Sequence, residues 1–267
     1  NTPAMSLKEF DQNIIYEASN YIPDDIEAVH FDYQVVGLDE ETQEMDAIII
    51  AIKNDIILSF VQSIESAGLQ PVIADIDYFA MQNMFEHCYP EEQDKVIALI
   101  DIGARYARVN IVHQGVSLFN GDVAVGGRMY NEALKESLGM SVGDSERAKK
   151  GDSIEDFDDA QVRETVDKTT EQLTSELYRQ LKFFWGATES DKSIEEIYLS
   201  GGSAHIGGVL DELAAKTGNP CKILDPFSDV KQVKKITDEQ VALLSSKMSA
   251  CFGVALRRLG DKEHAIS

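Results

Sequence analysis

The sequence is poor in cysteine and in basic residues, and it has no long apolar run. Its three cysteines, Cys88, Cys221 and Cys251, are scattered without metal-ligand spacing, which favours a reducing compartment over a disulfide framework or a zinc site. No apolar run approaches the roughly 20 residues that cross a bilayer, so we expect no direct membrane insertion. The chain of 267 residues is 43% hydrophobic, which is enough for a sizeable core.

The charge balance is strongly acidic. Acidic residues outnumber basic ones by 47 to 24, which gives a formal net charge of −23. Such a surface repels the phosphates of nucleic acids and of anionic lipids, so we expect no nucleic-acid partner. The balance instead favours a neutral or basic partner.

The first part of the chain predicts alternating helix and strand. A capping box at Ser6 and apolar positions at helical spacing predict a helix that stops at Pro23. The elements expected next are strands over 31–35 and 46–52 paired as a hairpin, a helix capped by Asn54, and a strand over 72–76.

The remainder predicts a larger arrangement of the α/β class. The patterns predict a helix over 77–89, a polar connection and domain boundary at 90–95, strands over 96–101, 107–113 and 116–119, and a helix after Gly126-Gly127. They then predict a short helix over 146–150, a long core helix over 162–185, a strand over 194–199, a helix over 204–216, a strand over 221–224 and a final helix over 241–259.

An acid followed by a glycine turn, Asp101-Ile102-Gly103, ends one apolar strand and leads into the next. Glycine lets an anion approach the main chain, and the free N–H groups of such a turn can bind phosphate oxygens. The acid can hold a hydrated magnesium ion or orient a water. The pattern is short and also arises by chance in ordinary strand turns, but it makes Asp101 and Gly103 candidate phosphate-side residues.

A second glycine turn, Gly201-Gly202-Ser203, follows far later, where a strand is expected to run directly into a helix. A helix N-terminus with close backbone approach favours an anion, and the alternative is a plain connection. Between the two turns, Glu146 and Lys149 fall on one helix face. There a carboxylate can take ribose hydroxyls and a lysine stem can cover a purine, while the alternative is a solvated charged helix.

These three pieces, in this order, resemble the nucleotide-binding motifs of the actin, Hsp70 and FtsA superfamily, and within it the chain resembles the PilM family of type IV pilus assembly proteins. The segments that carry the resemblance are the tyrosine-isoleucine-proline stretch within residues 17–37, residues 74–80, Gly126-Gly127-Arg128 and Asp225-Pro226-Phe227. They are spread over essentially the whole chain. The resemblance implies an actin-like ATPase fold, of the ribonuclease H-like α/β type, with an FtsA-type 1C subdomain.

The resemblance also implies a division into subdomains. These are 1C over residues 1–70, the remainder of domain IA over 71–93 and 240–267, domain IIA over 94–138 and 194–239, and IIB over 139–193. The superfamily's opening strand-turn-strand, with its own D-x-G motif, is expected ahead of Asn1, so we expect the N-terminal part of domain IA to be missing from this sequence. An exposed sheet edge would then allow a homo-oligomer.

The ligands implied by the resemblance are ATP or ADP with magnesium. Carried over residue by residue, Asp101, Gly103, Ala104 and Arg105 would face the phosphates, Glu146 and Lys149 the nucleoside, and Gly201, Gly202 and Ser203 the adenosine side. Asp101 would reach magnesium through water, and Asp101 and Gln82 would be the catalytic positions that orient water or metal. The chain departs from many relatives at Arg105 and Tyr106, where Arg105 either pairs with a phosphate or crowds the site.

The function implied by the resemblance is a cytoplasmic scaffold, peripheral to the inner membrane through a partner, that binds ATP with weak or no ATPase activity. Its partner would be the cytoplasmic N-terminal tail of a PilN-type membrane protein, and an acidic surface suits a basic, membrane-proximal peptide. An FtsA-like filament-forming ATPase and a phosphotransferase remain alternatives on the same fold. We find no amphipathic helix pattern in residues 260–267 and no sugar-binding pattern, which argues against each in turn.

Overall fold

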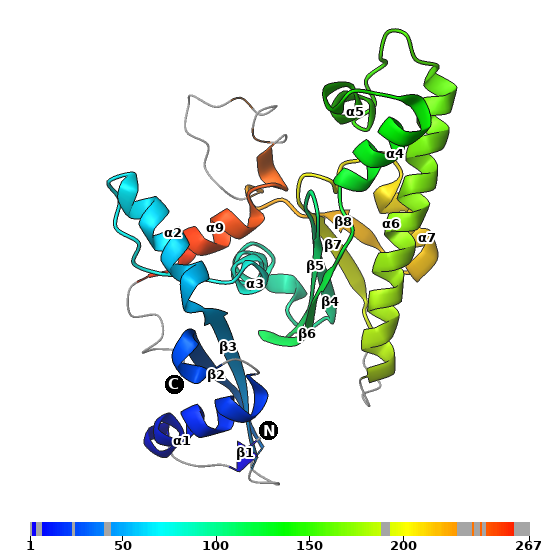
Figure 1. The fold of residues 1–267 in the computed structure, drawn as a ribbon. Coiled ribbons are helices and arrows are strands. Elements are labelled where there is room, and N and C mark those ends of the chain that lie inside the picture. Colours follow the sequence, from blue (N-terminus) through cyan, green and yellow to red (C-terminus); the bar gives the residue numbers. More distant parts are fainter. Residues whose placement is uncertain are drawn as a thin grey trace. The chain divides into compact units, whose positions relative to one another are not determined.

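The computed structural model describes residues 2–3, 7–22, 25–39, 44–187, 193–228, 237, 241 and 244–258. They form two compact units, one that includes the residues up to Ala74 and one that comprises residues 75–257 (Figure 1). The expected capping residue Ser6 and the helix stop at Pro23 lie outside the described residues. Among the helices that are described, none is both long enough and apolar enough to cross a membrane.

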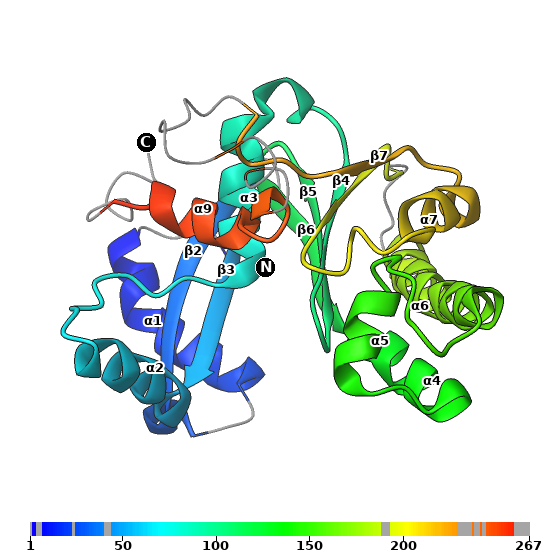
Figure 2. The ribbon, with the colours of Figure 1, turned by 90° about the horizontal axis from the view of Figure 1, so that it is seen from above.

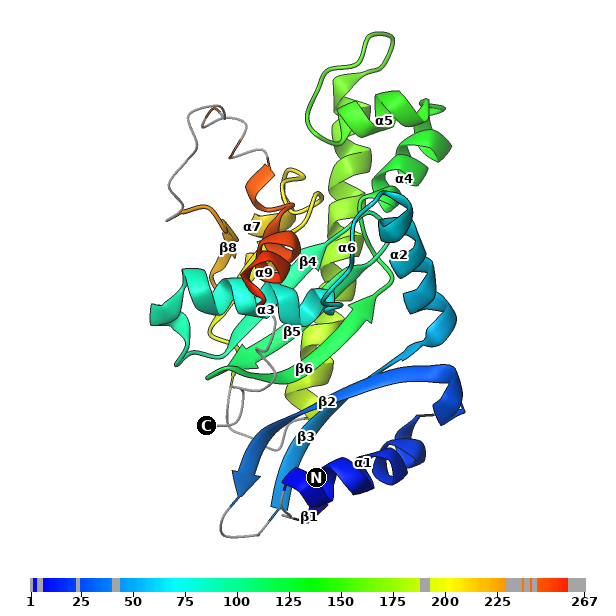
Figure 3. The same cartoon turned by 90° about the vertical axis from the view of Figure 1, so that its left-hand side faces the viewer.

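The first unit is a small antiparallel sheet with a helix against one face (Figure 3). Its elements are β1 (Thr2–Pro3), α1 (Leu7–Tyr21), η1 (Ile26–Ala28), β2 (Val29–Asp39), β3 (Glu44–Lys53) and α2 (Asn54–Ser66). The expected hairpin is confirmed, because β2 and β3 pair antiparallel from Val29 opposite Lys53. The core lies between α1 and the hairpin, where Phe10 meets Tyr33 edge-on with ring centroids 5.0 Å apart.

Two expectations for this part of the chain are wrong. Asn54 does not cap α2: the cap position is Lys53, and the Asn54 side-chain amide instead donates to the Glu27 carbonyl at 3.0 Å. Residues 72–76 form no strand. The Asp75 carboxylate accepts the Ile76 amide at 2.8 Å, a local bond that competes with a sheet ladder, and α3 begins at Asp77.

The second unit is built on a mixed five-stranded sheet in the order β6-β5-β4-β7-β8. Its elements are α3 (Asp77–Cys88), η2 (Pro90–Glu92), β4 (Ile97–Ile102), β5 (Ala107–His113), β6 (Val116–Val123), α4 (Arg128–Leu138), α5 (Val142–Ala148), α6 (Asp159–Ala187), β7 (Glu196–Ser200), α7 (Val209–Thr217), β8 (Cys221–Ile223) and α9 (Ser249–Leu256). β5 pairs antiparallel with both β4 and β6. On the other side of β4, β7 and then β8 extend the sheet with parallel pairing.

Helices bury both faces of this sheet. Alternate side chains of β4, including Ala98, Ile100 and Ile102, pack with α6 and α7 on one face. The intervening ones, Ile97 and Leu99, pack with α3 on the other. Figure 2 shows α3 and α9 side by side on that second face, with α6 and α7 on the first. Since Asp101 continues the series of Ile97 and Leu99, its side chain belongs to the α3 face.

A small satellite core joins α4, α5 and the start of α6. It consists of five buried apolar residues, Leu134, Met140, Ala148, Ile154 and Val162. α5 begins earlier than the expected 146–150 helix because the Ser141 hydroxyl caps it, accepting the Asp144 amide at 3.1 Å.

Two of the expected helices in this unit have the wrong limits. Residues 201–208 are turns, and α7 begins only at Val209, because Gly201 and Gly208 have φ of +92° and +85°, which interrupts a right-handed helix. In the expected final helix, residues 241 and 244–245 are helical as predicted, but a turn at residues 246–248 interrupts it before α9. There the Ser246 carbonyl accepts the Gly201 amide at 2.8 Å, so it does not continue a helical ladder.

Candidate functional site

The D-x-G turn joins β4 to β5 as expected. β4 ends at Ile102, and the Gly103 amide donates to the Tyr106 carbonyl at 3.0 Å to close the turn. Within the described part of the chain, the amides of Ala104 and Arg105 donate to no protein acceptor. Arg105 is exposed and forms no ion pair with another described residue. The tip of the turn therefore presents two adjacent N–H groups and one guanidinium to an anion.

The second glycine turn packs directly against the first. The Ser203 amide donates to the Ile102 carbonyl at 3.0 Å, and the Ser203 hydroxyl donates to the Gly103 carbonyl, also at 3.0 Å. A Cβ on Gly201 would lie 2.5 Å from the Ile102 carbonyl oxygen and 2.7 Å from Asp101 Oδ1. Only glycine permits that approach. The structure thus brings the two predicted turns together, although no helix begins at Ser203.

A third glycine turn, at Gly126 and Gly127, completes the cluster. The Gly127 amide donates to the Gly103 carbonyl at 3.0 Å, and the Arg128 amide donates to the Ala104 carbonyl at 2.8 Å. A Cβ on Gly126 would lie 2.6 Å from the Gly103 carbonyl oxygen. The sequence predicted a helix start here, but the contact with the first turn was not foreseen.

Lys149 ties this third turn to α4 and α5. Its ammonium donates to the Gly127 carbonyl at 3.1 Å, to Asn131 Oδ1 at 3.0 Å and to Glu146 Oε1 at 2.5 Å, and the side chain is only 8% exposed. Partial burial raises the pKa of the Glu146 carboxyl, but the hydrogen bonds from Lys149 and Asn131, together with the positive charges of Lys149 and Lys150, leave that pKa below its ordinary value. The predicted pairing of Glu146 with Lys149 on one face is confirmed. Lys149 contacts Gly127, and Gly127 in turn contacts Gly103 in the phosphate-side turn.

Asp101 lies in a chain of charged groups that the sequence did not predict. Arg108 faces it across the hairpin and also contacts Asp77 at the start of α3. Burial raises the pKa of the Asp101 carboxyl above its ordinary value, the Arg108 guanidinium opposes that rise, and the negative charge of Asp77 adds to it. The sequence does contain a signal for the pairing of Arg108 with Asp101, because a four-residue turn after Ile102 places residue 108 opposite residue 101.

Gln82 is not brought to this cluster. Its side-chain amide donates to Glu86 Oε1 at 2.7 Å and to the Gly115 carbonyl at 2.9 Å, and its oxygen accepts from Asn110 at 3.2 Å. Gly115 lies in the turn from β5 to β6, at the end of the sheet opposite Gly103. A fully engaged, buried amide at that end does not face the glycine turns.

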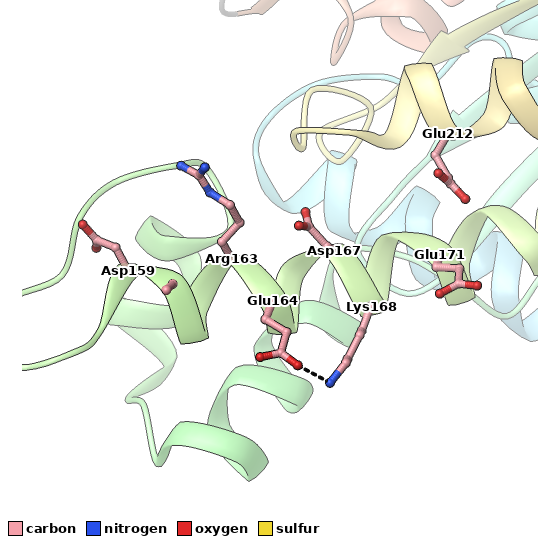
Figure 4. A pocket seen from close by; sticks show the side chains of 8 residues that line it. Asp159, Arg163, Glu164, Asp167, Lys168, Glu171 and Glu212 are labelled. Carbon is pink, nitrogen blue, oxygen red and sulfur yellow. Dashed lines mark hydrogen bonds and ion pairs between the residues drawn. The ribbon is translucent and has the colours of Figure 1, made fainter.

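A separate hollow of about 800 Å³ lies along α6 and the edge of α7 (Figure 4). Its lining is mostly acidic and consists of Asp159, Ala160, Arg163, Glu164, Asp167, Lys168, Glu171 and Glu212. Lys168 pairs with Glu164 at 2.6 Å, so it offers little charge to an anion. Because the mostly acidic hollow would repel phosphate, the glycine turns are the better candidate for a nucleotide site.

The donor set around Asp101 does not suit a metal held by protein ligands. Within the described ranges, no group of three or more His, Cys, Asp or Glu side chains is placed to hold a metal ion. Asp101 Oδ2 faces the Arg108 guanidinium, and Asp101 Oδ1 lies against Gly201. Both oxygens of the partly buried Asp101 carboxylate therefore already have neighbours.

Comparison with known proteins identifies the fold and the family. A family model described as type IV pilus assembly protein PilM matches residues 3–259. A chain of a structure titled "PilM-PilN type IV pilus biogenesis complex" is similar with a TM-score of 0.82 and 26% identity, covering 96% of this chain and 74% of that one.

More distant structures share the fold alone. MreB 5 of Spiroplasma citri, in a structure titled as bound to AMPPNP, has a TM-score of 0.55 and 13% identity over 80% of this chain and 67% of that one. The ethanolamine utilization protein EutJ from Carboxydothermus hydrogenoformans has a TM-score of 0.50 and 15% identity over 85% of each. The expected actin-like α/β fold is confirmed.

Proposed function

The chain belongs to the PilM family of type IV pilus assembly proteins, and from that premise we propose that it is a nucleotide-binding scaffold that holds the N-terminal peptide of a PilN-type membrane protein. The observation that carries this proposal is the likeness, at 26% identity over 96% of this chain, to the chain of the PilM-PilN complex. The proposal places the chain at the cytoplasmic face of the inner membrane, held there by its partner. A net charge of −23 supports a basic peptide as the ligand.

The nucleotide half of the proposal is supported by the convergence of three glycine turns. We assign the phosphates of ATP or ADP to the free amides of Ala104 and Arg105, with the Arg105 side chain beside them. We assign the adenosine side to Ser203 and to the amide of Gly202, which also has no acceptor among the described residues. We assign the nucleoside to the face of α5 that carries Glu146, whose carboxylate is partly exposed.

The same proposal assigns the subdomains by family likeness: 1C over residues 1–70, IA over 71–93 and 240–267, IIA over 94–138 and 194–239, and IIB over 139–193. Gln82 is left out of the site because its amide is held near Gly115. A water-mediated magnesium contact of Asp101 is also left out, since the carboxylate pairs with Arg108. Since the described part of the chain offers no free base or metal ligand at the turn, we expect nucleotide binding with little hydrolysis.

Isothermal titration calorimetry of the whole chain with ATP and with ADP tests the proposed nucleotide binding. We expect saturable binding, with phosphate release far below the roughly 1–1,000 turnovers per second of ordinary enzymes, because the described residues place no free catalytic base at the turn. Phosphate release in that ordinary range would contradict a scaffold and favour the phosphotransferase. Sedimentation that depends on ATP would instead favour the filament-forming alternative.

A further inference from the structure

A lysine from a distant part of the chain lies beside the second glycine turn. Gly202 is exposed, and a Cβ built on it would lie 3.9 Å from Cε of Lys247. Lys247 belongs to the short turn before α9 and is itself exposed. Its ammonium, one bond beyond Cε, therefore lies at the surface close to the bare main chain of Gly202.

The neighbouring residue, Ser246, fixes the position of Lys247. The Ser246 carbonyl accepts the Gly201 amide at 2.8 Å and the Ser200 hydroxyl at 2.7 Å. The Ser246 hydroxyl lies 2.8 Å from Nε2 of His205, and Ser246 is fully buried. Because these contacts hold Ser246 against the glycine turn, the side chain of the next residue starts from a fixed point beside that turn.

Lys247 forms no ion pair with another described residue. Other cations near the glycine turns are engaged: Lys149 pairs with Glu146, and Arg108 faces Asp101. An unpaired ammonium beside an exposed backbone N–H group can offer an anion a charge-assisted hydrogen bond. In a chain with a net charge of −23, such a place is a specific local exception to the overall repulsion of anions.

The second glycine turn lies between the two halves of the proposed nucleotide site. The Ser203 hydroxyl ties it to the phosphate-side turn by its bond to the Gly103 carbonyl at 3.0 Å. The proposed function assigns Gly202 and Ser203 to the adenosine side. The phosphate that adjoins the nucleoside is then the one nearest Gly202 and Lys247. That phosphate is the α-phosphate, which ATP and ADP share.

We propose that Lys247 binds the α-phosphate of the nucleotide, together with the Gly202 amide. The inference rests on the proposed function for the nucleotide itself, and it adds to the site a residue from the segment before α9. A lysine ammonium binds phosphate as a point charge with several donors. The positive charge at the site comes, in this account, from two distant segments: Arg105 in the phosphate-side turn and Lys247 beside α9.

Isothermal titration calorimetry with ATP and with ADP, at one fixed Mg²⁺ concentration, compares the whole wild-type chain with K247M and K247R. Methionine keeps an unbranched apolar stem and removes the charge. We expect K247M to bind both nucleotides about tenfold more weakly, and by the same factor, because both carry the α-phosphate. K247R keeps the charge and should lose less than about threefold. Circular dichroism melting establishes that each variant is folded.

K182M is the matched control. Lys182 is exposed on α6, and its ammonium lies 4.8 Å from the centre of the Tyr178 ring. Its loss changes the net charge by the same amount and should leave both affinities unchanged. Folded K247M that binds ATP and ADP as tightly as the wild type does, or K182M that loses as much as K247M, would overturn the inference. A loss confined to ATP would place Lys247 at the terminal phosphate and would also overturn it.

A second measurement needs no variant. Lysines of the whole chain are acetylated with an amine-reactive reagent, and the rate at each lysine is read by mass spectrometry. Saturating ATP should slow acetylation of Lys247 several-fold and leave that of Lys182 unchanged. Equal rates at Lys247 with and without bound ATP would contradict the inference alone. A wild type that binds neither nucleotide would overturn the proposed nucleotide function, and the inference with it.

Discussion

Replacing Gly201 with alanine is expected to abolish nucleotide binding and to lower the free energy of unfolding by about 3 kcal/mol or more. Gly201 has a φ of +92°, and its Cβ would lie 2.5 Å from the Ile102 carbonyl oxygen. That oxygen already accepts the Ser203 amide, so a methyl group there must push the second glycine turn away from the first. Chemical denaturation measures the loss of stability, and calorimetric titration with ATP measures the loss of binding.

Gly218→Ala is the matched control for Gly201→Ala. Gly218 ends α7 with a φ of +75°, and a Cβ there meets nothing within 4 Å. This variant therefore carries the backbone strain without the clash, and it should cost about 1 kcal/mol while leaving ATP affinity unchanged. If both variants lost the same stability and both kept ATP binding, the close packing of the two turns would not matter for the site.

Replacing Gly253 with alanine is expected to destabilise the second unit by about 3 kcal/mol. Gly253 lies in α9 where it crosses α3, and a Cβ built on it would fall onto the main-chain carbonyl of Ala80. No side-chain rotation can relieve a clash with backbone, so the two helices must move apart. The higher helix propensity of alanine returns less than about 1 kcal/mol. Thermal melting by circular dichroism gives the change.

Gly186→Ala provides the comparison for Gly253→Ala. Gly186 is also helical and exposed, near the end of α6, and a Cβ there meets nothing within 4 Å. The same substitution should be neutral or slightly stabilising at that position. A Gly253→Ala protein as stable as Gly186→Ala would show that α3 and α9 do not pack as closely as described.

The α9 segment connects both sides of the proposed site. Ser246, just before α9, accepts the Gly201 amide at 2.8 Å and the Ser200 hydroxyl at 2.7 Å, so it holds the second glycine turn. α9 itself packs on α3, which begins with Asp77, a partner of Arg108. Loosening α9 should therefore disturb the adenosine-side turn and the charged groups at Asp101 together.

The strands and the D-x-G turn could be predicted because their signals are local. Apolar runs bounded by turn residues place β4, β5 and β7 within a few residues, and the hairpin register puts residue 108 opposite residue 101. The helix predicted from residue 204 failed because the sign of φ at Gly208 depends on the surrounding packing, which a sequence pattern does not contain. The apolar spacing, taken alone, predicts a helix that continues through Gly208.

The contacts between distant segments could not be predicted. Gly253 packs against Ala80 although the two lie near opposite ends of the sequence of the second unit. No local sequence pattern marks either residue as the point where two helices cross. For Lys149, helical spacing identified Glu146 as a neighbour, but Gly127 and Asn131 reach it only through the packing of α4 on α5. Gln82 was assigned by family likeness, and only its hydrogen bonds show that it lies at the Gly115 end.

The proposed scaffold function is tested most directly by titrating a synthetic PilN-type N-terminal peptide with the whole chain and measuring binding by fluorescence anisotropy. We predict saturable binding that weakens as salt rises, because the chain carries a net charge of −23 and the peptide is basic. A peptide of the same composition in scrambled order should bind far more weakly. A folded chain that binds ATP but gives no saturable signal with the peptide, or the same signal with the scrambled one, would contradict the scaffold function.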